Sequence, residues 1–183
     1  MRAASWLIGL TLVSGVAVGH ADVVGGDTLT RAGHPDGGQL DGSLSVWLAR
    51  RRGMLYVGGE IAVETHTQGE GDFALSYHAL IGIQRSLQPD LLLLVDAGLG
   101  PSQRLAFNGG VLANDPSIDT VGWVASGAVR SQLIMVLTTY RESDLGLGLI
   151  AEARSDVWLE SYGYGLGISF YAGNQASAKT GGQ

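Results

Sequence analysis

Hydrophobic residues alternate with small or polar residues in segment after segment of this chain. The clearest case is ESYGYGLGISF, from Glu160 to Phe170, where Gly163, Gly165 and Gly167 occupy every second position between aromatic and aliphatic side chains. A period of two is that of a β-strand, whose successive side chains point to opposite faces. Glycine weakens a strand interior, so three at this spacing predict a face on which side chains have little room.

The alternation predicts an all-β chain of about eight strands. Most connections between them are short, which favours an antiparallel up-and-down meander. We place strands at residues 43–49, 55–66, 73–86, 91–100, 145–154 and 157–170, with two more inside 119–141. In that last stretch the apolar residues fall on one face throughout, so a single long strand fits it as well. Such a strand exceeds the common lengths, which favours two strands separated by a turn at 130–132.

The segments outside the strands lack this alternation. Residues 1–21, MRAASWLIGLTLVSGVAVGHA, have the basic start, the apolar run and the small residues around the cleavage point of a signal peptide. The apolar run is shorter than a membrane-spanning helix. Residues 22–42 are rich in Gly, Asp and Thr and predict a flexible lead-in, and residues 172–183 predict a polar tail. The sequence therefore predicts an exported protein with one β-barrel domain at 43–171.

The composition excludes several classes of function. Without Arg2, which leaves with the signal peptide, 10 of the 11 basic residues remain against 17 acidic ones, a net charge of −7. No basic face accumulates, so we expect no nucleic-acid partner. The absence of cysteine excludes disulfides and thiolate metal sites. Hydrophobic residues make up 45% of the chain and charged residues only 15%, so something must cover an apolar surface, and lipid is one candidate.

The face opposite to the apolar one indicates which side of the sheet is enclosed. It carries the glycines quoted above, four more in the strands 91–100 and 145–154, and a few charges. Small residues with scattered charges fit the lumen of a narrow eight-stranded barrel. Charges buried there must pair, and Glu152 could do so with Arg154 or Arg130. We therefore expect four charged residues to face the lumen: Glu60, Asp96, Glu152 and Arg154.

The outward face then carries aliphatic residues at its middle and aromatic residues towards the strand ends, among them Trp123, Trp158, Tyr162 and Phe170. With the signal peptide and the alternating strands, this pattern resembles the small outer-membrane β-barrels of Gram-negative bacteria. The resemblance implies a place in the outer membrane and contact with outer-membrane lipid. A soluble β-protein, in which glycine faces let two sheets pack closely, is the competing fold.

Three residues could supply chemistry in such a barrel. Glu64, Ser76 and His78 share one face of the predicted hairpin, and pairing of Ala62 with His78 would set Glu64 opposite Ser76. Contact between hydroxyl, imidazole and carboxylate is what nucleophilic catalysis requires. The set resembles the arrangement that some outer-membrane lipid hydrolases use. The other interpretation is a hydrogen-bond network in the lumen, which every barrel with a polar interior needs.

Two further groups of residues are candidate binding sites. His66, His78 and Glu64 offer a metal only two histidines and no clear further ligand, so we predict no metal site. The triplet Arg50-Arg51-Arg52 lies at a predicted turn, where it either holds the phosphates of lipopolysaccharide or faces solvent. No glycine-rich phosphate loop precedes a helix, and we expect no cofactor.

The sequence favours an outer-membrane β-barrel with a structural, adhesive or narrow-passage role and without catalysis. One alternative is a soluble periplasmic or secreted β-barrel that binds a small apolar ligand. The other is a membrane-embedded lipid hydrolase. The sequence leaves open whether the barrel has a protein partner in the cell envelope.

Overall fold

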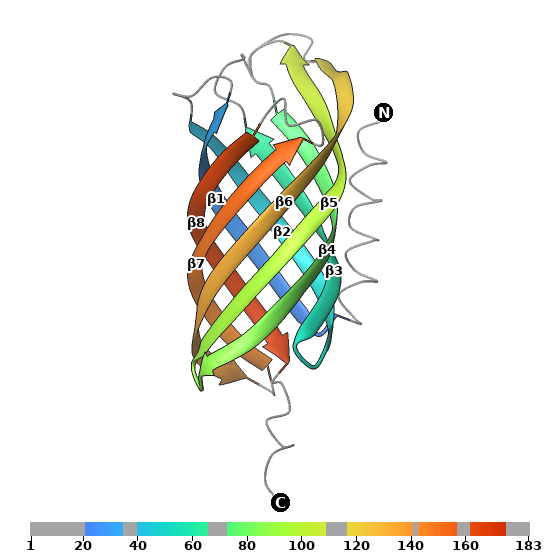
Figure 1. The fold of residues 1–183 in the computed structure, drawn as a ribbon. Helices are drawn as coiled ribbons and strands as arrows, with labels where there is room; N and C mark the ends of the chain where they lie inside the picture. The colour runs from blue at the N-terminus through green and yellow to red at the C-terminus, as the bar shows by residue number, and fades with distance from the viewer. Residues whose placement is uncertain are drawn as a thin grey trace, which may run out of the picture.

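The structure is a computed structural model that describes residues 21–34, 40–65, 73–108, 117–140, 143–156 and 162–174. They form a closed antiparallel barrel in which each strand pairs with the next and the last pairs with the first (Figure 1). The strands are β1 (Val23–His34), β2 (Leu40–Arg52), β3 (Leu55–Thr65), β4 (Phe73–Gln88), β5 (Leu91–Asn108), β6 (Ser117–Tyr140), β7 (Ser143–Asp156) and β8 (Tyr162–Asn174). The described residues contain no helix long and apolar enough to cross a membrane. The predicted eight-stranded meander is confirmed.

The prediction misses one strand, β1, and divides another, β6. Strand bounds also differ: β5 runs to Asn108 and not to 100, and β8 is Tyr162–Asn174, so it includes the first residues of the predicted polar tail 172–183. β1 lies within the segment predicted as a flexible lead-in, so the barrel begins at residue 23 and not at 43. Its alternation is hard to see because Asp27 and Arg31 point inward while Thr28 and Thr30 point outward, so neither face is apolar. β6 is one strand of 24 residues without a turn at 130–132. The missed strand and the divided strand cancel in the strand count.

Strand tilt explains why β6 is so long. Following the paired residues once around the barrel from Val23 leads back to β1 at Gly33, ten residues further along. Such a stagger requires strands that tilt strongly against the barrel axis, and tilted strands need more residues to span a given height. Figure 1 shows this tilt, and it shows that β5 and β6 project beyond the other strands at one end.

The two ends of the barrel have different connections. At one end lie the β2–β3 turn at Gly53 and Met54 and the β4–β5 turn at 89–90, and Val23 pairs there with Gly173. Gly53 has a φ of 61°, which glycine adopts without strain. We call this the short-turn end. The longer connections 35–39, 66–72, 109–116 and 157–161 join strands at the opposite end and lie outside the described residues. So do residues 1–20 of the predicted signal peptide 1–21, His66, Trp158 and residues 175–183 of the predicted tail.

The polarity of the barrel is inverted relative to a soluble protein. Leu149 and Leu166 point outward and are 69% and 72% exposed. Strands β2 to β8 all carry large apolar side chains on this outer face. The interior, by contrast, buries eight acidic and arginine side chains: Asp27, Arg31, Glu60, Glu64, Asp96, Arg130, Glu152 and Arg154.

The glycines of β8 face this interior and make room for large neighbours. Gly165 pairs with Glu152 on β7, and a β-carbon on Gly165 would lie 2.8 Å from Cγ of Arg31. A β-carbon on Gly167 would collide with the backbone carbonyl oxygen of Thr28. The period-two glycines therefore serve close packing inside the barrel, as their spacing predicts.

Candidate functional site

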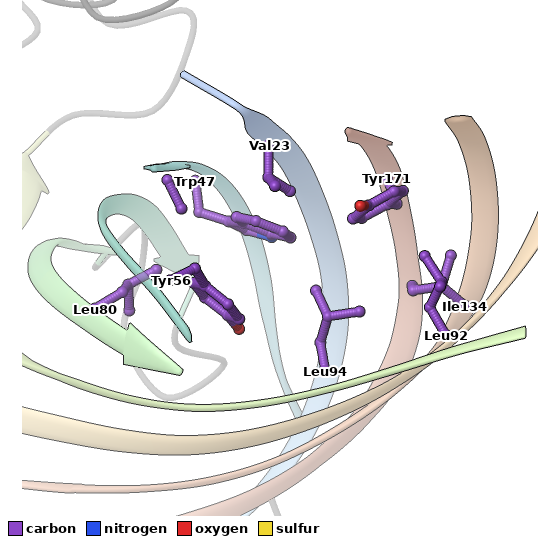
Figure 2. Packing of buried hydrophobic residues seen from close by; sticks show 9 residues of the cluster. Val23, Trp47, Tyr56, Leu80, Leu92, Leu94, Ile134 and Tyr171 are labelled. Atoms are coloured by element: carbon purple, nitrogen blue, oxygen red, sulfur yellow. The ribbon is translucent and has the colours of Figure 1, made fainter. Parts of the chain in front are cut away.

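The interior near the short-turn end is filled by apolar side chains. Trp47 stacks on Tyr56 with ring centroids 6.2 Å apart and planes inclined by 20°. Around them pack further buried residues from the same end of the barrel (Figure 2). We call this group the apolar plug; it consists of Val23, Trp47, Ala49, Tyr56, Leu80, Leu92, Leu94, Ile134 and Tyr171.

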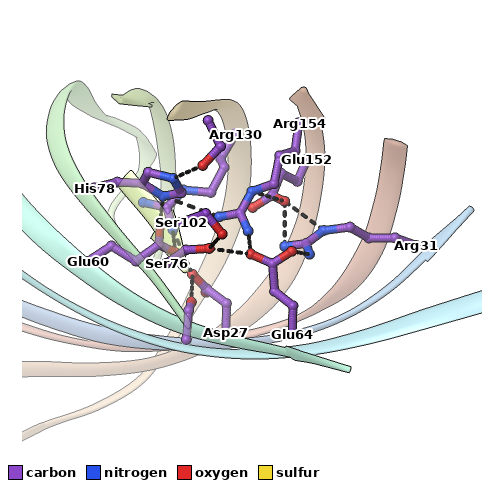
Figure 3. Close-up of polar contacts among 12 residues, drawn as sticks. Asp27, Arg31, Glu60, Glu64, Ser76, His78, Ser102, Arg130, Glu152 and Arg154 are labelled. Carbon is purple, nitrogen blue, oxygen red and sulfur yellow. Dashed lines mark hydrogen bonds and ion pairs between the residues drawn. The ribbon is translucent and has the colours of Figure 1, made fainter. Parts of the chain in front are cut away.

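Ionic and hydrogen-bonding side chains occupy much of the rest of the interior (Figure 3), together with a few buried apolar ones such as Leu29 and Ile150. We call the eight buried charged residues named above, together with His78, the charged network. Five carboxylates and three guanidinium groups come from β1, β3, β5, β6 and β7, and His78 comes from β4. Each lies at an inward position of its strand, so strand alternation alone brings them together.

Arg130 is the centre of the part of this network that lies nearer the apolar plug. Its Nε donates a hydrogen bond to Asp96 at 2.7 Å. Its Nη1 donates to Glu60 at 2.5 Å and to Asp27 at 3.4 Å. The Tyr56 hydroxyl of the apolar plug donates to the other oxygen of Asp96 at 2.6 Å, which joins the plug to the network.

Two more arginines organise the part of the network further from the plug. Arg31 forms ion pairs with Glu152 at 2.6 Å and with Glu64 at 3.0 Å. Arg154 pairs with Glu64, and its Nε lies 3.7 Å from Glu152. Two carboxylates are thus shared between two guanidinium groups, an arrangement in which buried charges compensate each other.

The proposed catalytic residues lie in the network but do not form a catalytic set. Glu60 pairs with His78 in the sheet, so the register is shifted by two residues from the predicted pairing of Ala62 with His78. The Ser76 hydroxyl donates to Glu64 at 2.7 Å and lies 2.9 Å from Ser102. This places Ser76 beside the carboxylate, whereas catalysis needs it beside the imidazole.

His78 has other partners for both ring nitrogens. Nδ1 lies 3.0 Å from Glu60, which only accepts, and 3.2 Å from Nη2 of Arg154, which only donates. Nε2 lies 2.9 Å from the Ser126 hydroxyl. Ser76 is 0% exposed and His78 is 3% exposed, so neither is open to a substrate. The geometry fits the alternative interpretation, a hydrogen-bond network inside the lumen.

The four residues expected to face the lumen, Glu60, Asp96, Glu152 and Arg154, are all buried there. The main ion-pair partner of Glu152 is Arg31, which the sequence analysis missed because it assigned no strand to the segment 22–42. Asp27 was missed for the same reason. The missed signal is the parity of β1, which sets Asp27, Leu29 and Arg31 on one side.

The arginine triplet is divided by the structure. Arg51 bonds to the chain where β1 and β8 close the barrel. Its Nη2 donates to the carbonyl of Asn174 at 2.7 Å, and its backbone N–H donates to Asp22 at 2.9 Å. Arg50 and Arg52 are exposed at the short-turn end. Among the described residues, no group of three His, Asp or Glu side chains has the geometry of a metal site.

Comparison with known proteins identifies the fold. No protein-family model matches the sequence, and no curated protein matches it. Among solved structures, Neisserial surface protein A is similar with a TM-score of 0.58 at 14% identity, covering 81% of this chain and 95% of that one. The outer membrane enzyme PagL is similar with a TM-score of 0.50 at 13% identity, covering 79% and 97%. The chain therefore has the fold of the small eight-stranded outer-membrane β-barrels, which confirms the resemblance predicted from the sequence.

Proposed function

We propose that this protein is an integral outer-membrane β-barrel with a closed interior, and that its role is structural or adhesive. The observation that carries the proposal is the inverted polarity. Seven of the eight strands present large apolar side chains outward, where water would disfavour them and lipid would not. Ion pairs and hydrogen bonds fill the inside.

The filling of the lumen argues against a passage. The apolar plug occupies the short-turn end, and the charged network continues it with side chains that are almost fully buried. An eight-stranded barrel is just wide enough for its own side chains. The same filling argues against a soluble barrel that holds a small apolar ligand, because such a barrel needs an apolar interior with free space.

A structural or adhesive role is supported by the shape of the opposite end. β5 and β6 extend beyond the other strands there (Figure 1). A rigid barrel that holds such strands at a membrane surface is suited to present them to a partner. The buried, separated Ser76 and His78 give no support to a lipid hydrolase.

Cell fractionation tests the location, and electrophoresis with and without boiling tests the closed barrel. We expect the protein in the outer-membrane fraction, with a mobility that changes on heating. A soluble band without a heat shift would overturn the proposal. Reconstitution in planar bilayers tests the closed lumen: we expect no steady unitary conductance, and a reproducible one would favour the narrow passage.

A further inference from the structure

Three arginines lie on the outer face of the barrel at the short-turn end. Arg50 and Arg52 have the same strand parity as the exposed Val46, and Arg85 has the same parity as the exposed Ile83. All three side chains are exposed. They therefore continue the outward apolar face of β2 and β4 at the point where it ends.

Arg52 and Arg85 are near neighbours across β3, and Arg50 continues their patch along β2. Arg52 pairs with Leu55, and Leu55 pairs with Ile83, which precedes Arg85 by two residues. Only β3 separates the two strands, so their axes lie roughly 10 Å apart. The long side chains of Arg52 and Arg85 can reach phosphate groups that lie between them, and Arg50 can contact a neighbouring phosphate along β2.

The position of the patch defines which lipid it can meet. In outer-membrane barrels the short turns lie on the periplasmic side and the longer loops outside. The patch would then lie at the inner leaflet, which contains glycerophospholipids, and not at the outer leaflet with its lipopolysaccharide. Leu55 beside it is 57% exposed on the outward face of β3, which suits contact with lipid. Asp90 in the β4–β5 turn lies at the same end of the barrel, as do Asp22 and Asp144.

We propose that Arg50, Arg52 and Arg85 form a binding site for the phosphate groups of inner-leaflet glycerophospholipids and that the site prefers anionic headgroups. This inference rests on the proposed placement in the outer membrane. Arginine recognises phosphate with two parallel hydrogen bonds, and these gain strength at a membrane boundary. Arg51, the middle residue of the triplet, bonds to Asp22 and Asn174 where β1 and β8 close the barrel, and it takes no part in the site.

The test uses the mature full-length protein in nanodiscs made of equal parts of phosphatidylcholine and phosphatidylglycerol. Native mass spectrometry then counts the lipids that remain bound after release. We expect wild type to retain more phosphatidylglycerol than phosphatidylcholine. In Arg52→Gln the ratio of the two retained lipids should fall roughly fivefold. The triple variant Arg50→Gln/Arg52→Gln/Arg85→Gln should lose it entirely. Arg104→Gln is the matched control, because Arg104 is exposed near the opposite end of the barrel.

Two results would overturn the inference. One is a wild-type protein that retains both lipids equally; the other is an Arg104→Gln variant that loses as much preference as Arg52→Gln. A parallel experiment with lipid A in the nanodiscs distinguishes the leaflets: retention of lipid A through the same three arginines would reject the inner-leaflet source. Fractionation of the same variants keeps the two proposals separate. Wild type in the outer membrane without a lipid preference rejects only this site, whereas a soluble wild type rejects the proposed function.

Discussion

The two parts of the barrel interior are closed by different forces. The apolar plug is closed by packing, as in the stacking of Trp47 on Tyr56, and among its described side chains only the hydroxyls of Tyr56 and Tyr171 hydrogen-bond to residues outside it. The charged network excludes water by pairing, because a buried charge without a counter-charge is strongly unfavourable. Arg130 alone serves three carboxylates. The network is therefore more specific in its residues and more easily disrupted by a single change.

The largest effect is expected at the centre of the network. Arg130→Ala would leave Asp27, Glu60 and Asp96 without their shared counter-charge, and we expect it to lower the free energy of unfolding by about 4 kcal/mol. Urea unfolding in lipid vesicles, followed by tryptophan fluorescence, measures this. Arg130→Lys, which keeps the charge, should recover part of the loss. A loss from Arg130→Ala as small as that of a surface residue would refute the view that pairing closes this half.

A smaller loss is expected in the apolar plug. Leu94 is fully buried, and Leu94→Ala would leave a cavity that lowers the free energy of unfolding by about 3 kcal/mol. The same urea titration applies. Leu94→Met conserves volume and should cost much less. If Leu94→Ala and Leu94→Met were equally damaging, the plug would not be closed by packing alone.

The glycines of β8 permit a matched test of how tightly the interior fits. A β-carbon on Gly167 meets the backbone oxygen of Thr28, so we expect Gly167→Ala to cost about 2.5 kcal/mol. Gly163→Ala is the control, because its nearest contact, the carbonyl oxygen of Ala32 at 3.3 Å, requires only a small shift. The temperature at which the heat-modified band appears compares the two variants. Equal temperatures would contradict the packing assigned to Gly167.

The smallest effect concerns the bond that joins the two regions. Tyr56→Phe keeps the stacking on Trp47 but removes the hydrogen bond to Asp96, and we expect a loss of about 1.5 kcal/mol. A double-mutant cycle with Asp96→Asn measures the coupling. Additive losses from the two single substitutions would show that the plug and the network are energetically independent.

Most of the fold follows from alternation, and the exceptions have physical causes. β1 escapes detection because a strand with charged residues inside and threonines outside has no apolar face to reveal it. β6 was divided because common strand lengths come from less tilted sheets. Which side chains point into the barrel was also predictable, because alternation along each strand sets Glu60, Asp96 and Glu152 on the inward face.

The partners within the interior were much less predictable. They depend on the register between strands, and a shift of two residues keeps every side chain on its face while changing every neighbour. The predicted register sets Glu64 opposite Ser76 and Ala62 opposite His78, whereas the observed register sets Glu64 opposite Ala74 and Glu60 opposite His78. Pairings across the lumen, such as Arg31 with Glu64 and Glu152, depend on the closure of the whole barrel.

The most direct test of the account is the reactivity of single cysteines, since the natural chain has none. The variants Leu149→Cys, Leu166→Cys and Met54→Cys are reconstituted in nanodiscs and exposed to a membrane-impermeant maleimide. We expect Met54→Cys in the β2–β3 turn to react, while the two outward positions on β7 and β8 stay unmodified until the protein is unfolded. Rapid reaction at all three positions in the folded protein would show that the apolar face meets water, and the outer-membrane barrel would be rejected.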